Sequence, residues 1–165
     1  MLQPVGESAG GQLVTLAAGS EQHLAGVVSL YGVYDIEQVA GNPSDPRSLA
    51  RRLFGFTSLD ATAIATLRAF SPIRHAAGTL PPMLLVAGTA DRLLAQQRAY
   101  AEALGSAGAR VEPWPGRSRY TRGSVVTAEI ADAPHGIEAW HEPTPWRMWE
   151  VHVGDWLRFL VQRPN

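Results

Sequence analysis

Gly6-Glu7-Ser8-Ala9-Gly10-Gly11, close to the start of the 165-residue chain, is the stretch that decides the fold. It matches the pattern G-x-S-x-G, in which a serine occupies a sharp turn between a strand and a helix and its hydroxyl stands above the end of a sheet. Glycines flank the serine because the turn brings backbone close to backbone. The motif predicts a strand within residues 1–5 and a helix over residues 8–18.

The rest of the chain alternates apolar runs with helical patterns. Short runs rich in branched side chains predict strands at 25–31, 83–88 and 110–114, the last suited to a sheet edge because of its proline. Helical spacing predicts helices at 95–104 and in the last twenty residues, where Trp149, Val153, Trp156, Leu157 and Leu160 recur. Ser124–Ile130 has strand-like content and is expected to form a hairpin or an added edge. The order βαβ(α)βαβα indicates an α/β fold with a mostly parallel sheet flanked by helices.

Residues 35–74 interrupt this alternation. Asn42-Pro43 and Asp45-Pro46 mark turns, and Ser58 or Asp60 is suited to cap a helix that runs to Phe70. Ser71-Pro72 is typical of a second helix start. No clear strand is visible here, so the segment is expected to leave the sheet and return to it.

Composition excludes several classes of function. The formal net charge is −1 and there is no basic run, which argues against nucleic acid or an anionic membrane as the main partner. No apolar segment is long enough to span a bilayer. Cysteine is absent, so disulfides and thiolate chemistry are excluded. The compartment is left open by the sequence, with the cytoplasm slightly favoured, and so is the oligomeric state.

Metal and cofactor sites are not expected. His23, His75 and His152 lack ligand spacing with a carboxylate. Trp140, Trp146 and Trp149 suggest either an aromatic platform or, as the preferred interpretation, packing of helix and loop.

Three residues of the right types follow three strand-like segments in the order Ser8, Asp91, His135. A serine hydroxyl is a weak nucleophile and needs a nearby base, which in turn needs an orienting group. Each residue alone has a structural explanation, as a helix cap, a turn residue or a solvated loop residue, but together they predict nucleophilic catalysis. His141 is the alternative base and Asp132 the alternative acid.

The chain resembles the C-terminal part of α/β-hydrolases of the esterase and lipase group, in particular hormone-sensitive-lipase-like and feruloyl-esterase-like carboxylesterases. The resemblance is carried by Gly6-Glu7-Ser8-Ala9-Gly10-Gly11, Val28-Ser29-Leu30-Tyr31-Gly32 with Tyr34-Asp35, Ser71-Pro72, Leu80-Pro81-Pro82-Met83-Leu84-Leu85-Val86-Ala87-Gly88-Thr89-Ala90-Asp91, and Pro134-His135-Gly136. It is weak from Pro115 to Ile130.

The resemblance implies a role for each matching residue. Ser8 would be the nucleophile, His135 the general acid and base, and Asp91 the carboxylate that orients it, while the backbone N–H of Ala9 would be an oxyanion-hole donor. Glu7 is expected at the pocket edge or in a structural salt bridge. The implied activity is hydrolysis of small-molecule esters with short acyl or aryl groups, without a cofactor. A prolyl-oligopeptidase-like serine peptidase and a catalytically silent fragment are the alternatives.

The resemblance also implies parts that these 165 residues do not contain. The family's other oxyanion donors come from a His-Gly-Gly-rich loop upstream of the nucleophile, on an earlier strand. Neither that motif nor strands before the nucleophile strand are present. We therefore expect residues 1–165 to be the C-terminal part of a single α/β-hydrolase domain, in which residues 35–74 form a cap-like or excursion segment.

Overall fold

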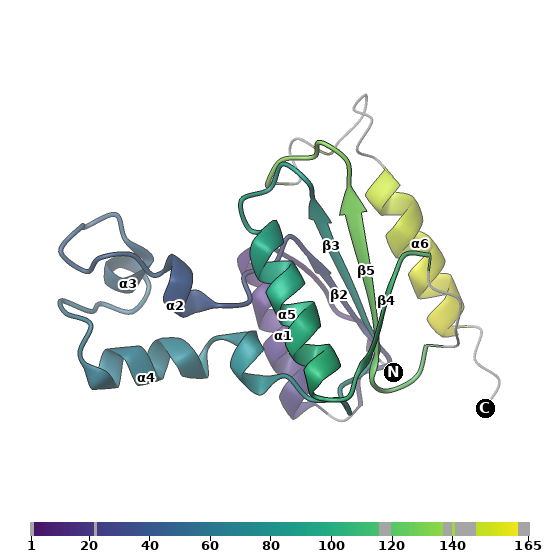
Figure 1. The fold of residues 1–165 in the computed structure, drawn as a ribbon, viewed down its shortest axis with the longest axis horizontal. Coiled ribbons are helices and arrows are strands. Elements are labelled where there is room, and N and C mark those ends of the chain that lie inside the picture. The colour runs from purple at the N-terminus through teal and green to yellow at the C-terminus, as the bar shows by residue number, and fades with distance from the viewer. Residues whose placement is uncertain (1, 22, 116–119, 137–139, 141–147, 162–165) are drawn as a thin grey trace.

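A computed structural model describes residues 2–21, 23–115, 120–136, 140 and 148–161. Its central feature is a parallel sheet in the order β1-β2-β3-β5-β4 (Figure 1). The strands are β1 (Val5–Glu7), β2 (Val27–Leu30), β3 (Met83–Gly88), β4 (Arg110–Pro113) and β5 (Ser124–Ile130). All four strand pairings are parallel, so every strand ends at the same edge of the sheet.

Helices follow most of the strands. They are α1 (Ala9–Ser20), α2 (Ile36–Val39), α3 (Leu49–Arg52), α4 (Ala61–Ala69), α5 (Leu94–Ser106) and α6 (Met148–Val161), with a short 3₁₀-helix η1 at Pro72–His75. In Figure 1, α1 and α5 lie on one side of the sheet and α6 on the other. The prediction of an α/β fold with a parallel sheet flanked by helices is confirmed.

The sheet is buried on both faces, and the alternation along β3 shows how. Met83 and Leu85 pack in the cluster that includes α5 side chains, whereas Leu84 and Val86 pack in the cluster that includes Trp156 of α6. All six residues of β3 are buried. A continuous apolar run is therefore the expected sequence for this strand, because successive side chains point to opposite faces and both faces are covered.

The expectation for Ser124–Ile130 was wrong. This segment is neither a hairpin nor an added edge but β5, which lies inside the sheet and pairs in parallel with both β3 and β4. The edge position falls instead to β4, where Pro113 stands at the strand end as its missing N–H requires. β5 is inside because its mostly buried side chains need cover on both faces.

The buried face of α1 is not the one that its apolar residues mark. Leu13, Leu16 and Ala17 recur at helical spacing, yet Leu13 is 60% exposed. Gln12 is buried in its place, and its amide Nε2 donates to the carbonyl oxygen of Phe70 at 2.7 Å. A tertiary hydrogen bond therefore decides which side of this helix faces inward.

Residues between β2 and β3 extend away from the sheet and carry α2, α3 and α4 (Figure 1). Asp60 caps α4 as predicted, since its Oδ1 accepts from the backbone N–H of Ala63 at 2.8 Å. The helix start at Ser71 is the short 3₁₀-helix η1, and Ser71 does not cap it with its side chain. Its Oγ accepts from the N–H of Ile36 and donates to the carbonyl of Leu67 instead.

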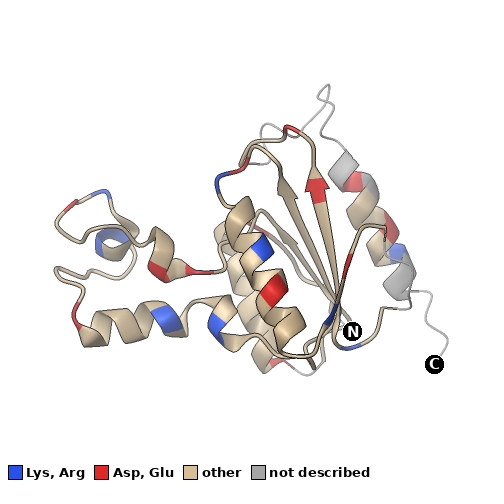
Figure 2. Ribbon diagram, viewed as in Figure 1, with Lys and Arg blue, Asp and Glu red and all other residues tan. Residues whose placement is uncertain are grey.

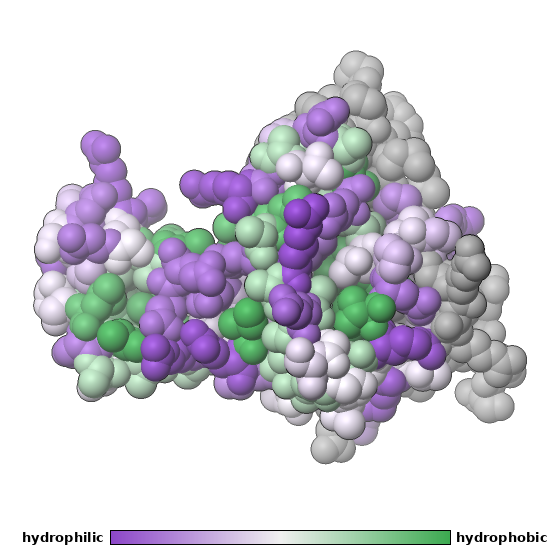
Figure 3. All heavy atoms as spheres, in the orientation of Figure 1, coloured by the Kyte–Doolittle hydropathy of each residue, from purple (hydrophilic) through white to green (hydrophobic). Residues whose placement is uncertain are grey.

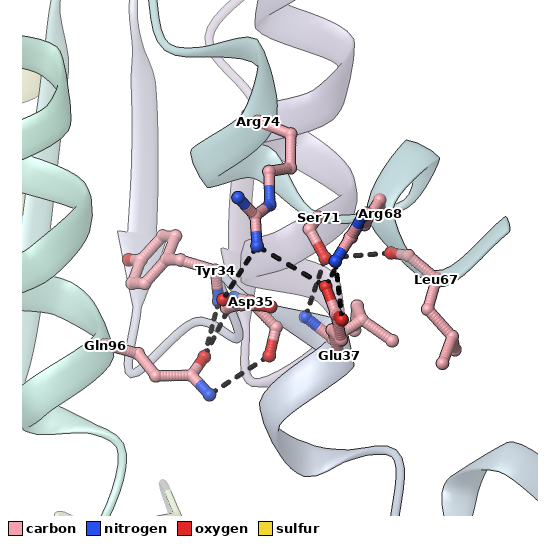
Figure 4. A network of polar contacts seen from close by, with 9 residues as sticks. Tyr34, Asp35, Glu37, Leu67, Arg68, Ser71, Arg74 and Gln96 are labelled. Atoms are coloured by element: carbon pink, nitrogen blue, oxygen red, sulfur yellow. Dashed lines mark hydrogen bonds and ion pairs between the residues drawn. The ribbon is translucent and has the colours of Figure 1, made fainter. Parts of the chain in front are cut away.

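Both ends of this segment are fastened at one place, shown in Figure 4. Gln96 of α5 accepts from the backbone N–H groups of Tyr34 and Asp35, each at 3.0 Å, and its Nε2 donates to the carbonyl of Asp35 at 3.1 Å. Glu37 receives Arg68 Nε at 2.8 Å and Arg74 at 3.4 Å. The departing end of the segment is thus anchored to α5, and the returning end is paired with the departing end.

On the face drawn in Figures 2 and 3, the described residues do not gather into one large charged or apolar patch. Acidic and basic residues are interspersed along the described ribbon (Figure 2), and the face in Figure 3 mixes hydrophilic side chains with smaller apolar patches. Within the described ranges, no helix has the length and apolar character needed to cross a membrane.

Candidate active site

Ser8 occupies the turn between β1 and α1, and its backbone is strained. Its φ of 49° and ψ of −114° lie outside the regions that most residues adopt. Its N–H donates to the carbonyl of Leu30 at 2.9 Å, which ties the turn to the end of β2. At Gly6 a Cβ would stand 2.2 Å from the carbonyl oxygen of Gly10, so only glycine allows this close approach. Strain of this kind is typical of functional sites.

Asp91 and His135 come to Ser8 from two other strand ends. Asp91 follows β3 and His135 follows β5. The Oγ of Ser8 lies 3.0 Å from Nε2 of His135. The other ring nitrogen, Nδ1, lies 2.9 Å from Oδ2 of Asp91. The structure therefore brings the three predicted residues together in one hydrogen-bonded chain.

The partners of the His135 ring define its proton positions. An ionised Asp91 only accepts hydrogen bonds, so Nδ1 of His135 must carry the proton that is donated to it. In the neutral ring Nε2 is then an acceptor, and the Ser8 hydroxyl donates to it. The Asp91 side chain is fully buried, whereas the His135 side chain is 27% exposed. The imidazole is thus partly open to solvent, while the carboxylate is shielded from it.

Asp91 is held by a second contact. Its Oδ1 accepts from the backbone N–H of Leu93 at 2.7 Å, so both carboxylate oxygens have partners. A carboxylate fixed at both oxygens has one orientation, and this orientation points Oδ2 at the histidine.

The loops that carry Asp91 and His135 are bonded to each other. The N–H of Ala90 donates to the carbonyl of Ala133 at 3.1 Å, and the N–H of Asp132 donates to Thr89 Oγ1 at 2.7 Å. At Gly88 a Cβ would stand 1.8 Å from the carbonyl oxygen of Ala133. The two loops therefore touch along their backbones, which sets the separation of Asp91 and His135.

Ala9 is the first residue of α1. Its N–H belongs to the first turn, where no preceding helical carbonyl can accept, and it lies at the positive end of the helix dipole. This group is directly next to Ser8 in the chain.

The alternative residues have different positions. Asp132 is exposed, and its backbone N–H donates to Oγ1 of Thr89. His141, Trp146 and the side chain of Trp149 lie outside the described residues. Among the described residues, no group of three or more acidic and histidine side chains is arranged to hold a metal ion.

Sequence reasoning missed one residue at this site. Tyr31 directly follows β2, and its ring contacts His135 with centroids 5.0 Å apart. Its hydroxyl donates to Oε2 of Glu7 at 2.5 Å, so Glu7 pairs with a phenol rather than with a basic side chain. The sequence does carry one indication for Tyr31. This residue stands at the end of an apolar run, and the ends of such runs meet at the sheet edge where Ser8, Asp91 and His135 lie. Trp140 packs in the core as preferred, fully buried against Tyr31.

Comparison with known protein families gives a match over most of the chain. The family model described as alpha/beta hydrolase fold matches residues 4–116. No curated protein sequence matches the chain.

Solved structures similar to this one include three hydrolases. Esterase 2 from Thermogutta terrifontis, phosphoramylated by tabun, is 20% identical with a TM-score of 0.60, over 99% of this chain and 56% of that one. A truncated carbohydrate esterase from gut microbiota is 16% identical with a TM-score of 0.65, over 91% of this chain and 57% of that one. An acetyl ester-xyloside bifunctional hydrolase from Caldicellulosiruptor lactoaceticus is 17% identical with a TM-score of 0.65, over 93% and 54% respectively. At these identities the similarity concerns the fold, and the chain spans little more than half the length of each.

Proposed function

Because this chain belongs to the alpha/beta hydrolase fold family, we propose that it is a serine carboxylic-ester hydrolase acting on short acyl or aryl esters. The observation that carries the proposal is the hydrogen-bonded chain from Ser8 through His135 to Asp91 at three strand ends of one parallel sheet. A serine, a base and an orienting carboxylate in this arrangement are the parts that acyl transfer requires.

In the proposed reaction, Ser8 Oγ attacks the ester carbonyl carbon while Nε2 of His135 takes the hydroxyl proton. The tetrahedral intermediate collapses, the bond from carbon to the alcohol oxygen breaks, and His135 gives the proton to the leaving alcohol. Water then attacks the acyl-enzyme and gives a proton to His135. Release of the acid breaks the acyl bond, and the proton returns to Ser8 Oγ.

Two features support the electrostatics of this reaction. Asp91 would stabilise the imidazolium that forms, and its contact with Nδ1 supports this role. The N–H of Ala9 supplies one donor for the oxyanion of the tetrahedral intermediate. Ala9 is the donor that residues 1–165 contribute in this proposal.

The proposed preference for short acyl groups has support from the fold neighbours. The Thermogutta terrifontis esterase has been solved with propionate bound, at 19% identity to this chain, and with butyrate bound, at 22% identity. The segment of residues 35–74 is proposed to take part in substrate choice, as the cap-like part of a single hydrolase domain.

The test compares ester and amide substrates on the purified chain. We expect turnover of p-nitrophenyl acetate and little turnover of an aminoacyl-prolyl amide, and we expect Ser8→Ala to abolish the ester activity. Ser20→Ala is the matched control, because Ser20 ends the same helix and is exposed. Ester turnover retained in Ser8→Ala, or its absence in the unaltered chain, would contradict the proposal, and preference for the amide would indicate a peptidase.

A further inference from the structure

Tyr31 has a backbone conformation that demands an explanation. It directly follows β2, its φ is 39°, and only 2% of its surface is exposed. A left-handed conformation is unfavourable for a bulky side chain. Its backbone N–H donates to the carbonyl of Val86 at 2.6 Å, so the strained turn is fastened to the neighbouring strand. The fold therefore stabilises an unfavourable turn that sends the Tyr31 side chain in one particular direction.

That direction leads to the two sides of the candidate site. The hydroxyl donates to Oε2 of Glu7, the residue that precedes Ser8. The ring lies against the imidazole of His135 with an angle of 71° between the planes. One side chain thus connects the residue next to the serine with the residue that acts as its base.

The loop that carries His135 is also held from behind. Trp140 is fully buried, and its ring lies 4.9 Å from that of Tyr31 at 74°. Its indole Nε1 donates to the carbonyl of Pro134 at 2.7 Å. The Tyr31 ring therefore lies between the rings of His135 and Trp140, and Trp140 is bonded to Pro134, the residue before His135.

The hydrogen bonds of His135 leave one motion to be restrained. Its two bonds, to Ser8 and to Asp91, end at the two ring nitrogens and fix two points. The ring can still tilt about the line through those points, which bends both bonds away from linearity and weakens them. An aromatic ring packed against the imidazole opposes this tilt. A phenol bonded to a carboxylate is a firm support, because hydrogen bonds to ionised groups are among the stronger ones.

We propose that Glu7 and Tyr31 form a positioning pair that fixes the orientation of the His135 ring between Ser8 and Asp91. The inference rests on the proposed function, since it assigns these residues to the same reaction. Neither residue touches the reacting atoms in this account: Tyr31 acts through His135, and Glu7 acts through Tyr31.

The first experiment measures Ser8 labelling by a fluorophosphonate probe in Tyr31→Phe, Glu7→Ala and the double variant. Each single change is expected to slow labelling about 3- to 10-fold, the effect of one lost hydrogen bond. Labelling of the double variant is expected to be no slower than that of a single variant, because the two residues act as one unit. Glu7→Gln keeps an acceptor and is expected to retain about half of the rate.

Tyr34→Phe is the matched control. Tyr34 is also fully buried and bonds through its hydroxyl, to Ser29 at 2.8 Å, but it stacks on Tyr100 rather than on His135. Tyr34→Phe is expected to lower the stability of the protein. Once the rate is corrected for the fraction of folded protein, the labelling of Ser8 should be as fast as in the unaltered chain. The proposal would be overturned if the two single effects on the labelling rate multiplied in the double variant. It would also be overturned if Tyr34→Phe slowed labelling as much as Tyr31→Phe does.

The second experiment reads the histidine ring directly and needs no activity. Nitrogen-15 NMR of the His135 ring should show one tautomer, protonated at Nδ1, in the unaltered chain and in Tyr34→Phe. In Tyr31→Phe and Glu7→Ala its signals should shift toward those of a ring that exchanges tautomers. Unchanged ring signals in both variants would contradict the positioning role. An unlabelled Ser8 in the unaltered chain would instead contradict the proposed function, so the two failures are distinct.

Discussion

Gly88→Ala is the substitution for which the structure makes the sharpest prediction. Gly88 ends β3, and the added Cβ would stand 1.8 Å from the carbonyl oxygen of Ala133, two residues before His135. Real Cβ contacts essentially never fall below 3.0 Å, so the two loops must separate by about 1 Å. The atom in the way is backbone, which no side-chain rotation can move.

This displacement should affect catalysis far more than folding. A misplacement of about 1 Å costs on the order of a hundredfold in rate, because the base no longer reaches the nucleophile. Overpacking at one site costs about 1–3 kcal/mol in the free energy of unfolding. We therefore expect the variant to fold with reduced stability and to react with a fluorophosphonate about a hundredfold more slowly at Ser8.

Urea unfolding and the labelling rate are the two measurements. Gly19→Ala is the control, since Gly19 lies in α1 and a Cβ there would meet nothing within 4 Å. It should gain up to about 1 kcal/mol of stability, as alanine does over glycine in a helix, and label at the unaltered rate. A folded Gly88→Ala protein that labels within about threefold of the unaltered rate would refute the argument that contact between the loops positions the base.

Three further changes test separate parts of the structure. Asp91→Asn should fold but label about 10³- to 10⁴-fold more slowly, because an amide can donate to Nδ1 and favour the wrong tautomer of the base; a rate near normal would exclude Asp91 as its orienting group. Gln96→Met should lower the free energy of unfolding in urea by about 2–4 kcal/mol, since two buried N–H groups lose their acceptor. Gln97→Met is its matched control, because the buried amide of Gln97 has no hydrogen-bond partner among the described residues, and equal losses at the two positions would contradict the assignment. Burial lowers the pKa of His152. Below about pH 6.5 the unfolded chain therefore binds more protons than the folded chain, and the free energy of unfolding should decrease as the pH is lowered. His152→Phe should make the fall in melting temperature between pH 7 and pH 5 smaller, and an unchanged dependence would show that this ring does not contribute.

The parts of the site that depend on local sequence were predictable. The turn at Ser8 follows from glycine spacing, which acts within a few residues. Asp91 and His135 could be placed because each follows an apolar segment, and the ends of parallel strands share one edge of a sheet. Their mutual distances could only come from the structure, since they depend on how the loops after β3 and β5 touch.

The parts that depend on distant partners were not predictable. The periodicity of α1 favours burying Leu13, and only the carbonyl of Phe70 explains why Gln12 is buried instead. The place of β5 inside the sheet is a matter of strand order, which neighbouring residues do not encode. The sequence around Tyr31 indicates only the end of a strand. Its φ of 39° and its hydrogen bond to Glu7, 24 residues away in the sequence, depend on tertiary packing.

Ser8 is proposed as the nucleophile of this chain, activated by His135. The most direct measurement is peptide mapping by mass spectrometry after reaction with a fluorophosphonate. We expect one covalent adduct, on the peptide that contains Ser8, which is lost in Ser8→Ala and strongly reduced in His135→Ala. An adduct on another residue, or undiminished labelling in Ser8→Ala, would contradict it.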